Sequence, residues 1–520
     1  MEGYETTPTN TKIGKATFWS FAAEIAAKII TPIINMVLAR LLAPEAFGII
    51  ATLNIVIALA ETFSSAGFQK YVVQHKFNDE DHFNRGASVA FWTNLFVSVI
   101  TWAVIASFNP QLAKIVGSEG YGIPLMIASL ALPLASLSSV HEGIFQRKLE
   151  YRVLFVRRLI VSLVPLFVTI PLALFGFGYW SLIIGTLSGN LFKFLLFLFM
   201  SKWKPKLYYS FRLFREMFSF CSWTLLESIA MWACSYIDVL IISNRLGDYY
   251  TGLYKNSQSM VTGILAIITG ATTSVLFSSL SRAQDDQKRF NQIFFSFQKY
   301  VAIFVLPLGV GIFCFRDLIT LILLGKQWTE ASFFVGIWGL CTSLVCVFGT
   351  FCREVYRAKG KPKISLIAQL LHLAFIIPVC IIFVDKGFDS LALARSLAYL
   401  QIIIVHMFLM GFVFKISPLK MFYEVKEPIL CSLIMGVFGL TMVHFFSHKV
   451  YLQITYVLVC VLIYFGSILL FPQYRKLLLV SLSNIKARFS KNKANKNNDD
   501  INISGADQLQ EKCKNTKDEI

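Results

Sequence analysis

Residues 178–206 read GYWSLIIGTLSGNLFKFLLFLFMSKWKPK, a predominantly apolar run that ends in a basic loop. A helix of about 20 apolar residues is long enough to cross the hydrocarbon core of a bilayer. The whole chain has this character, because 56% of its 520 residues are hydrophobic and 15% are charged. Its mean hydropathy of +0.63 is too high for a soluble globular protein of this length. The composition therefore predicts an all-α polytopic membrane protein.

Apolar runs of this length follow one another along the chain, and they predict about fourteen transmembrane helices. The predicted spans are 16–42, 46–68, 86–108, 121–145, 154–176, 178–201, 217–243, 252–279, 296–323, 331–356, 363–384, 390–414, 427–446 and 450–471. The runs do not alternate between apolar and polar residues, so transmembrane strands are excluded.

The Lys and Arg residues between the spans are shared unevenly by the two sets of alternate loops. Every loop of the first set carries two or more of them, as between Lys202 and Arg215 or between Arg357 and Lys363. No loop of the second set carries more than one. Because basic loops stay on the cytoplasmic side, this pattern predicts that both termini are cytoplasmic.

The sequence offers little catalytic chemistry. Gly325-Lys326 and Gly360-Lys361 lack the upstream glycine and the following Ser or Thr of a phosphate-binding P-loop. Asp79-Glu80-Asp81 is a D-x-D triplet, but it directly precedes a span, so we interpret it as a helix cap with Asn78 as the capping residue. The ten Cys include no CxxC pair, so we expect no metal site and no cofactor.

Five stretches at the ends of spans resemble one known family. They are VLARLLAPEAFGIIA (37–51), GIFQRKLEYRVLFVRR (143–158), IDVLIISNRLGDYYTGLYKNSQSM (237–260), LFSSLSRAQDDQKRF (276–290) and LLGKQWTEA (323–331). Together they resemble the polysaccharide transporters, especially the WzxC-like oligosaccharide flippases. These proteins share the multidrug/oligosaccharidyl-lipid/polysaccharide exporter superfamily with MATE antiporters and the lipid II flippase.

The resemblance implies two pseudo-symmetric lobes of six helices around a central cavity, with an extra helix pair outside them. The corresponding segments are an N-terminal lobe at 16–203, a C-terminal lobe at 213–415 and the extra pair at 427–472. Loop charge and composition, apart from the resemblance, predict a cytoplasmic N-terminus at 1–15 and a disordered basic and polar cytoplasmic tail at 473–520.

The same resemblance implies a flippase that moves undecaprenyl-pyrophosphate-linked oligosaccharide repeat units across the bacterial inner membrane by alternating access. The implied partners are this lipid-linked substrate, membrane lipid, a polysaccharide polymerase and a chain-length regulator. Nucleic acid is not among them, because no basic domain collects the positive charge of the chain.

Charged residues inside the spans are the candidate site residues, because each costs roughly 2.5–3.5 kcal/mol on insertion scales. Glu24 and Lys28 lie four residues apart in the first span, so a helix places both on one face. Either the pair neutralises itself within the helix, or Lys28 is a cavity cation for the pyrophosphate with Glu24 as its partner. Lys and Arg both suit a phosphate group.

Four further charges leave similar alternatives open. Lys255 is either a second cavity cation or a side chain that reaches the outer interface, and Glu227 is a deeper cavity candidate. Asp238 and Glu61 either coordinate a coupling ion or pair with a basic neighbour. An H⁺ or Na⁺ gradient is the candidate driving force.

Other polar residues within or near the spans are expected to have structural roles. Arg157 and Arg395 lie near the predicted ends of their spans, so we expect their side chains to reach the interface. His372 and His406 are expected to be satisfied by neighbouring polar groups.

Three other functions are alternatives to the flippase, and one of them, a structural scaffold, would leave the charges within the spans unexplained. A MATE-like exporter of organic cations would favour an acidic cavity, whereas Lys28 and Lys255 supply cations; Glu24, Glu227 and Asp238 weaken that distinction. An enzyme that acts on the same lipid would need a sizeable outer loop, and all predicted outer loops are short. We therefore predict a transporter.

The predicted topology is tested by reporter fusions after each span. A reporter that works only in the cytoplasm should be active when it is fused within Lys202–Arg215. A reporter that works only outside the cytoplasm should be active when it is fused within Asp385–Phe388. The opposite pattern at these two sites would contradict the predicted orientation.

Overall fold

The computed structural model describes residues 30–475, except for 66–67, 76, 78, 149, 362 and 446–449. Glu24, Lys28, the predicted N-terminus and the chain beyond residue 475 therefore lie outside the described residues. All regular structure within the described part is helical, which confirms the predicted fold class. Twelve helices of this part are long and apolar enough to cross a membrane.

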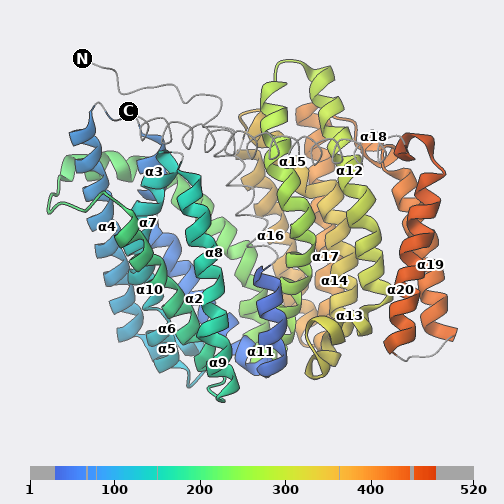
Figure 1. Ribbon diagram of the computed structural model, residues 1–520, viewed down its shortest axis with the longest axis horizontal. Coiled ribbons are helices and arrows are strands. Elements are labelled where there is room, and N and C mark those ends of the chain that lie inside the picture. The colour runs from blue at the N-terminus through green and yellow to red at the C-terminus, as the bar shows by residue number, and fades with distance from the viewer. Residues whose placement is uncertain are drawn as a thin grey trace, which may run out of the picture.

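The helices form two groups and an additional pair, which lie side by side in Figure 1. The first group, here the first lobe, is Ile30–Leu41, α2 (Pro44–Ser65), α3 (Phe68–Gln74), α4 (Glu80–Ser107), α5 (Asn109–Ile115), α6 (Gly122–Ala128), α7 (Ala131–Arg147), α8 (Tyr151–Phe167), α9 (Thr169–Leu174) and α10 (Tyr179–Met200). The second lobe is most of α11 (Phe211–Arg282) with α12 (Gln287–Cys314), α13 (Arg316–Leu323), a 3₁₀ turn at Lys326–Ala331, α14 (Ser332–Val345), a π turn at Cys346–Thr350, α15 (Phe351–Ala358), α16 (Lys363–Val384) and α17 (Phe388–Phe414). The short helix α18 (Pro418–Tyr423) follows the second lobe. The next two helices, α19 (Lys426–Phe445) and α20 (Val450–Leu469), lie at the edge of this lobe.

The long helix α11 is two helices that meet at Gly247. This residue has φ 81° and ψ −176°, a conformation that only glycine adopts without strain. The break falls in the predicted connection between spans 217–243 and 252–279. The twelve candidate spans count α11 once and leave out the shorter apolar helix Ile30–Leu41, and the predicted total of about fourteen stays a prediction.

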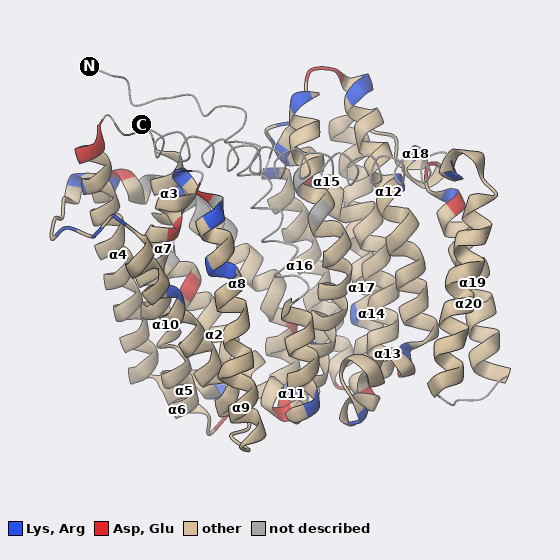
Figure 2. Ribbon diagram, in the orientation of Figure 1, with Lys and Arg blue, Asp and Glu red and all other residues tan. Residues whose placement is uncertain are grey.

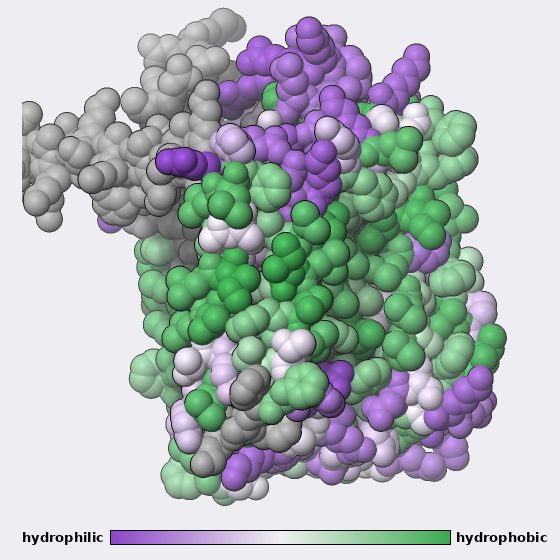
Figure 3. All heavy atoms as spheres, turned by 90° about the vertical axis from the view of Figure 1, so that its right-hand side faces the viewer, coloured by the Kyte–Doolittle hydropathy of each residue, from purple (hydrophilic) through white to green (hydrophobic). Residues whose placement is uncertain are grey.

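Charged residues gather at the two ends of the helices. Figure 2 shows most blue and red segments at these ends, with a broad tan band between them. Figure 3 shows the same division on the face formed by α19 and α20, where a green apolar band separates purple polar ends. A band of this kind is what a membrane-spanning protein presents to lipid. The end that carries the loops 201–210 and 415–425 is called the basic end below.

The pair α19 and α20 packs on the outside of the second lobe, as predicted. Cys431 and Met435 of α19 and Tyr464 of α20 share an apolar cluster with Ile303 and Cys314 of α12. The Tyr464 hydroxyl is buried and donates a hydrogen bond to the Ile303 carbonyl oxygen at 2.8 Å. This bond satisfies a polar group that would otherwise be costly in an apolar contact.

The two lobes touch backbone to backbone at the end opposite the basic end. A Cβ added at Gly252 of α11 would overlap the carbonyl oxygen of Pro44, and one added at Gly48 of α2 would overlap that of Asp248. Helices approach this closely only where side chains are absent. We call this region the closed end.

Hydrogen bonds between the lobes complete the closed end. Ser118 donates from Oγ to Asp248 Oδ1 at 3.0 Å, and Ser243 donates to the Val116 carbonyl oxygen at 2.7 Å. The Trp328 indole donates to the Ala39 carbonyl oxygen at 2.7 Å. The closed end therefore joins both lobes by polar contacts as well as by close packing.

Replacing Gly252 with alanine should destabilise this arrangement. The added methyl group must push α2 away from α11, and overpacking of this kind costs about 1–3 kcal/mol. The apparent unfolding temperature of the purified protein should fall.

Gly466→Ala is the matched control, because a Cβ at this glycine of α20 meets nothing within 4 Å. Its unfolding temperature should be unchanged or higher, since alanine favours a helix. Equal effects of the two substitutions would contradict the tight contact.

Candidate functional site

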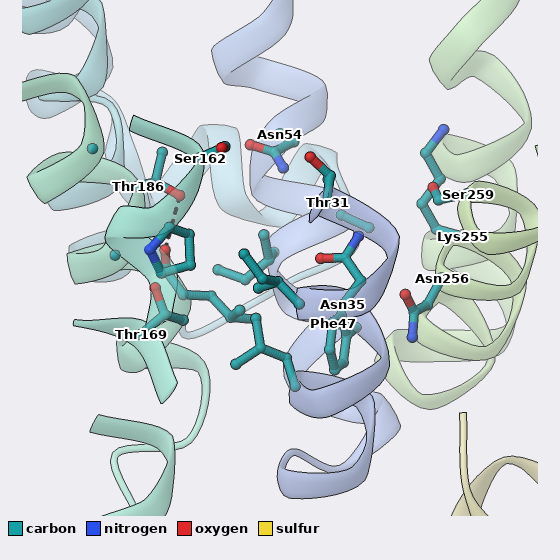
Figure 4. A pocket seen from close by; sticks show the side chains of 18 of the residues that line it. Thr31, Asn35, Phe47, Asn54, Ser162, Thr169, Thr186, Lys255, Asn256 and Ser259 are labelled. Atoms are coloured by element: carbon teal, nitrogen blue, oxygen red, sulfur yellow. Dashed lines mark hydrogen bonds between the residues drawn. The ribbon is translucent and has the colours of Figure 1, made fainter. Parts of the chain in front are cut away.

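A cavity of about 550 Å³ lies between the two lobes, on the basic-end side of the closed end. Its walls come from the Ile30–Leu41 helix, α2, α8, α9 and α10 of the first lobe and from α11. The polar lining residues include Thr31, Asn35, Asn54, Ser162, Thr186 and Asn256. Figure 4 shows these side chains on helices that face each other across the space. Hydroxyl and amide groups dominate the polar part of the lining.

Lys255 is the one charged side chain among the described residues that line the cavity. Its ammonium group donates to the Ser235 carbonyl oxygen at 3.3 Å and to Gln258 Oε1 at 3.2 Å. It also lies 5.1 Å from the centre of the Tyr236 ring, within the range of a cation–π contact. Of the two interpretations of Lys255, its position agrees with a cavity cation; its role in binding stays a prediction.

A chain of hydrogen bonds leads from Lys255 into the second lobe. Gln258, which accepts from Lys255, donates from Nε2 to the Tyr254 hydroxyl at 3.2 Å. Tyr254 donates in turn to Asp238 Oδ2 at 2.6 Å. The cavity cation is thus linked to a buried carboxylate through two intervening side chains.

Asp238 forms a buried ion pair with Arg395 of α17. Both Nε and a terminal nitrogen of Arg395 lie 3.0 Å from Asp238 Oδ2, and the Val239 backbone N–H donates to Oδ1 at 2.8 Å. The side chains are only 2% and 4% exposed. The pairing interpretation of Asp238 agrees with these contacts, and a role in ion coupling stays a prediction.

The expectation that Arg395 reaches the interface is wrong. Its guanidinium group lies 5.1 Å from the centre of the Trp338 ring and is turned inward onto Asp238. The physical reason is that an opposite charge and an aromatic face inside the lobe replace the contacts that water would offer.

The two remaining acidic candidates within the described helices are Glu61 and Glu227. Glu61 is an exposed residue of α2, seven residues beyond the cavity-lining Asn54 and therefore on the same helix face. It lies within electrostatic range of Tyr236, which also lines the cavity. Glu227 belongs to α11, and its side chain is outside the described part of the structure.

A second ionic cluster lies inside the first lobe. Arg157 of α8 donates through both terminal nitrogens to the two carboxylate oxygens of Glu142 of α7, at 2.9 and 3.1 Å. Lys193 of α10 lies 3.0 Å from Glu142 Oε2. The expectation that Arg157 reaches the interface is therefore wrong, because the Glu142 carboxylate holds it inside the lobe.

Glu142 and Lys193 are not among the site residues predicted from the sequence. Both interrupt apolar runs, in LASLSSVHEGIFQ and in SGNLFKFLLF, and that interruption is the signal that would have found them.

The remaining polar predictions are settled by local contacts. The Tyr356 hydroxyl lies 2.8 Å from His406 Nδ1, and Gln401 Oε1 lies 3.1 Å from His372 Nδ1, so both histidines have the expected neighbours.

The D-x-D triplet caps α4, as predicted, but the capping residue is Asp79 instead of Asn78. Its side chain accepts from the backbone N–H of His82.

The chain is similar to several proteins whose names place them in polysaccharide biosynthesis. The profile of a family described as "Polysaccharide biosynthesis protein" matches residues 37–333. The succinoglycan biosynthesis transport protein ExoT of Rhizobium meliloti is 24% identical over 317 residues, which are 61% of this chain and 63% of that protein. The lipopolysaccharide biosynthesis protein WzxC of Escherichia coli is 21% identical over 398 residues, or 76% of this chain and 79% of that protein.

One solved structure has the same fold over most of its length. It is the lipid II flippase MurJ in an inward closed conformation, with a TM-score of 0.71 and 18% sequence identity. The likeness covers 89% of this chain and 99% of that chain. The two-lobe architecture is therefore shared with a flippase structure, although the sequences have diverged widely.

Breaking the buried ion pair should be far more harmful than removing it altogether. Arg395→Met leaves the Asp238 carboxylate buried without its cation and should destabilise the protein by about 3–5 kcal/mol. The double variant Asp238→Leu/Arg395→Met removes both charges and should unfold at a higher temperature than Arg395→Met. A double variant that is less stable than Arg395→Met would contradict a mainly structural role for the pair.

Proposed function

The chain belongs to the polysaccharide biosynthesis protein family, and from this membership we propose that it is a lipid-linked oligosaccharide flippase. Its substrate would be an undecaprenyl-pyrophosphate-linked repeat unit used for a surface polysaccharide. Such a molecule cannot cross about 30 Å of hydrocarbon unaided, because its sugars and its diphosphate are strongly polar.

Within the structure, the observation that carries this proposal is the composition of the cavity. Hydroxyl and amide groups that donate and accept hydrogen bonds suit the hydroxyl groups of a sugar chain. Lys255 adds a fixed positive charge on the α11 wall, which suits a diphosphate. An exporter of organic cations would be poorly served by a cavity in which lysine is the one charged side chain among the described lining residues.

Transport by alternating access is consistent with the arrangement of the lobes. The closed end blocks passage on one side of the cavity, and its contacts are hydrogen bonds and glycine packing that rocking of the lobes can break and remake. We propose that the basic end faces the cytoplasm of a bacterium, since the Lys- and Arg-rich loops gather there. The protein then accepts its substrate from the inner leaflet.

We also propose that the protein is a transporter without an enzymatic step.

If transport is coupled to an ion, Glu61 is a better candidate than Asp238 for binding that ion. Asp238 is paired with the opposite charge of Arg395 and accepts a hydrogen bond from Tyr254, whereas Glu61 is exposed on the cavity face of α2. A polymerase and a chain-length regulator are the expected protein partners of a flippase of this family.

Reconstitution of the full-length protein into proteoliposomes tests the proposal. The probe is undecaprenyl pyrophosphate that carries a short fluorescent oligosaccharide, and the readout is the fraction of label bleached by external dithionite. The protein should raise this fraction above that of empty vesicles. Lys255→Gln should slow flipping about tenfold or more, because a charge-assisted hydrogen bond contributes about 1.5–3 kcal/mol.

Lys255→Arg should retain much of the rate, since it keeps the positive charge at the cavity wall. Lys386→Gln is the matched control, because Lys386 is an exposed lysine in the loop between α16 and α17. Wild-type protein that moves a fluorescent organic cation and leaves the lipid probe in place would overturn the flippase proposal in favour of an exporter.

A further inference from the structure

The cluster of Arg157, Glu142 and Lys193 lies one helical turn beyond the described cavity, toward the basic end. On α10 the lining residues Thr186, Gly189 and Asn190 are followed at helical spacing by Lys193. Lys193 is three residues past Asn190, or about 4.5 Å along the helix axis. Its side chain is 23% exposed.

On α8 the same register holds in the opposite chain direction. The lining residues Val161 and Pro165 are preceded at helical spacing by Arg157. Both helices thus continue the cavity face into the cluster, and Glu142 joins them from α7. Figure 2 shows acidic and basic segments close together within the first lobe, among α7, α8 and α10.

The cluster carries more positive charge than its own carboxylate balances. Glu142 is a single acid between two bases, so the three side chains have a net charge of +1. Arg157 Nε is buried and makes no hydrogen bond to a described residue. The fold alone does not account for such a group, because apolar residues of similar volume are often as stable in its place.

The geometry of the two cations suits a phosphate. Arg157 presents a planar guanidinium group that binds the Glu142 carboxylate through two parallel hydrogen bonds. Phosphate oxygens can accept the same pair of hydrogen bonds. Its orientation is held by Phe197, whose ring centre lies 5.0 Å from the guanidinium carbon. Lys193 provides a second, more mobile donor beside it.

We propose that Arg157 and Lys193 form a second anion site for the diphosphate of the lipid-linked substrate, between the basic end and Lys255. In the absence of substrate Glu142 occupies both cations as an internal counter-ion. The diphosphate, with more charge than one carboxylate, displaces Glu142, and Glu142 returns when the diphosphate moves on toward Lys255. This inference rests on the proposed function, since it assigns a further contact to the same substrate.

The counter-ion explains how the site releases its ligand. Two cations without a neighbouring acid would hold a diphosphate tightly at this depth, where charges are weakly screened. Glu142 competes for the same donors and so lowers the free energy needed for the diphosphate to leave. The site therefore binds the substrate transiently.

The test measures ligand-induced stabilisation of the full-length protein in lipid nanodiscs, which does not require flipping. The probes are undecaprenyl pyrophosphate, undecaprenyl monophosphate and inorganic pyrophosphate. For undecaprenyl pyrophosphate, Lys193→Gln should weaken binding about tenfold or more, because one charge-assisted hydrogen bond is lost. Glu142→Gln should strengthen binding and slow flipping, because the competitor is gone while both cations remain.

The opposite signs of these two effects separate a binding role from a structural one. Lys114→Gln is the matched control for Lys193→Gln, since Lys114 forms an exposed pair with Glu119 near the other end of the first lobe. Binding that is unchanged in Lys193→Gln, or weakened in both Lys193→Gln and Glu142→Gln, overturns the proposal. Lys193→Arg keeps the charge and should bind as wild type, which guards against a folding defect of the neutral variant.

The three probes separate the sources of the phosphate. Stabilisation by inorganic pyrophosphate that is lost in Lys193→Gln supports a site for the diphosphate itself. Equal stabilisation by the monophosphate and pyrophosphate lipids overturns selectivity for a diphosphate. The wild-type protein could bind the pyrophosphate lipid in a way that depends on Lys193 and yet not flip it. That result would support the second anion site and overturn the proposed function.

Discussion

The close approach of α2 and α11 at Gly48 and Gly252 is the constraint on which the rest of the architecture depends. Two backbones in direct contact leave no room for a side chain, so they fix the distance between the lobes at one end. The lobes diverge from this point toward the basic end, and the cavity lies in the space between them. The glycine contact therefore sets how closely α2 and α11, which form two of its walls, approach each other at the closed end.

Buried charge follows one rule in both lobes. Asp238 with Arg395, and Glu142 with Arg157 and Lys193, each place an acid within hydrogen-bond reach of a base from another helix. Such pairs tie the helices to one another, because separating them would strand an ion in a medium of low dielectric constant. The two clusters differ in balance: the pair in the second lobe is neutral and fully enclosed, whereas the first-lobe cluster has a surplus cation beside the cavity.

Much of the fold could be predicted from the sequence, because the length of apolar runs and the distribution of Lys and Arg report directly on membrane crossing. Lys255 was identified because a lysine in an apolar run is conspicuous without a structure. Arg395 was misplaced because its partner, Asp238, is 157 residues away in sequence, and no local pattern reveals that they meet. Arg157 was misplaced although Glu142 is only 15 residues away in sequence, because the two residues lie on different helices and the sequence does not show that these helices pack against each other.

The lining of the cavity has a consequence for cargo selection. Thr, Ser and Asn side chains can act as donors or acceptors and can rotate to suit the partner, so they distinguish one sugar from another only weakly. A lysine at a fixed place on the α11 wall is more demanding, because it requires a negative charge at one distance from the glycan. The protein would then recognise the diphosphate that every repeat unit carries, and it would tolerate variation in the sugars attached to that diphosphate.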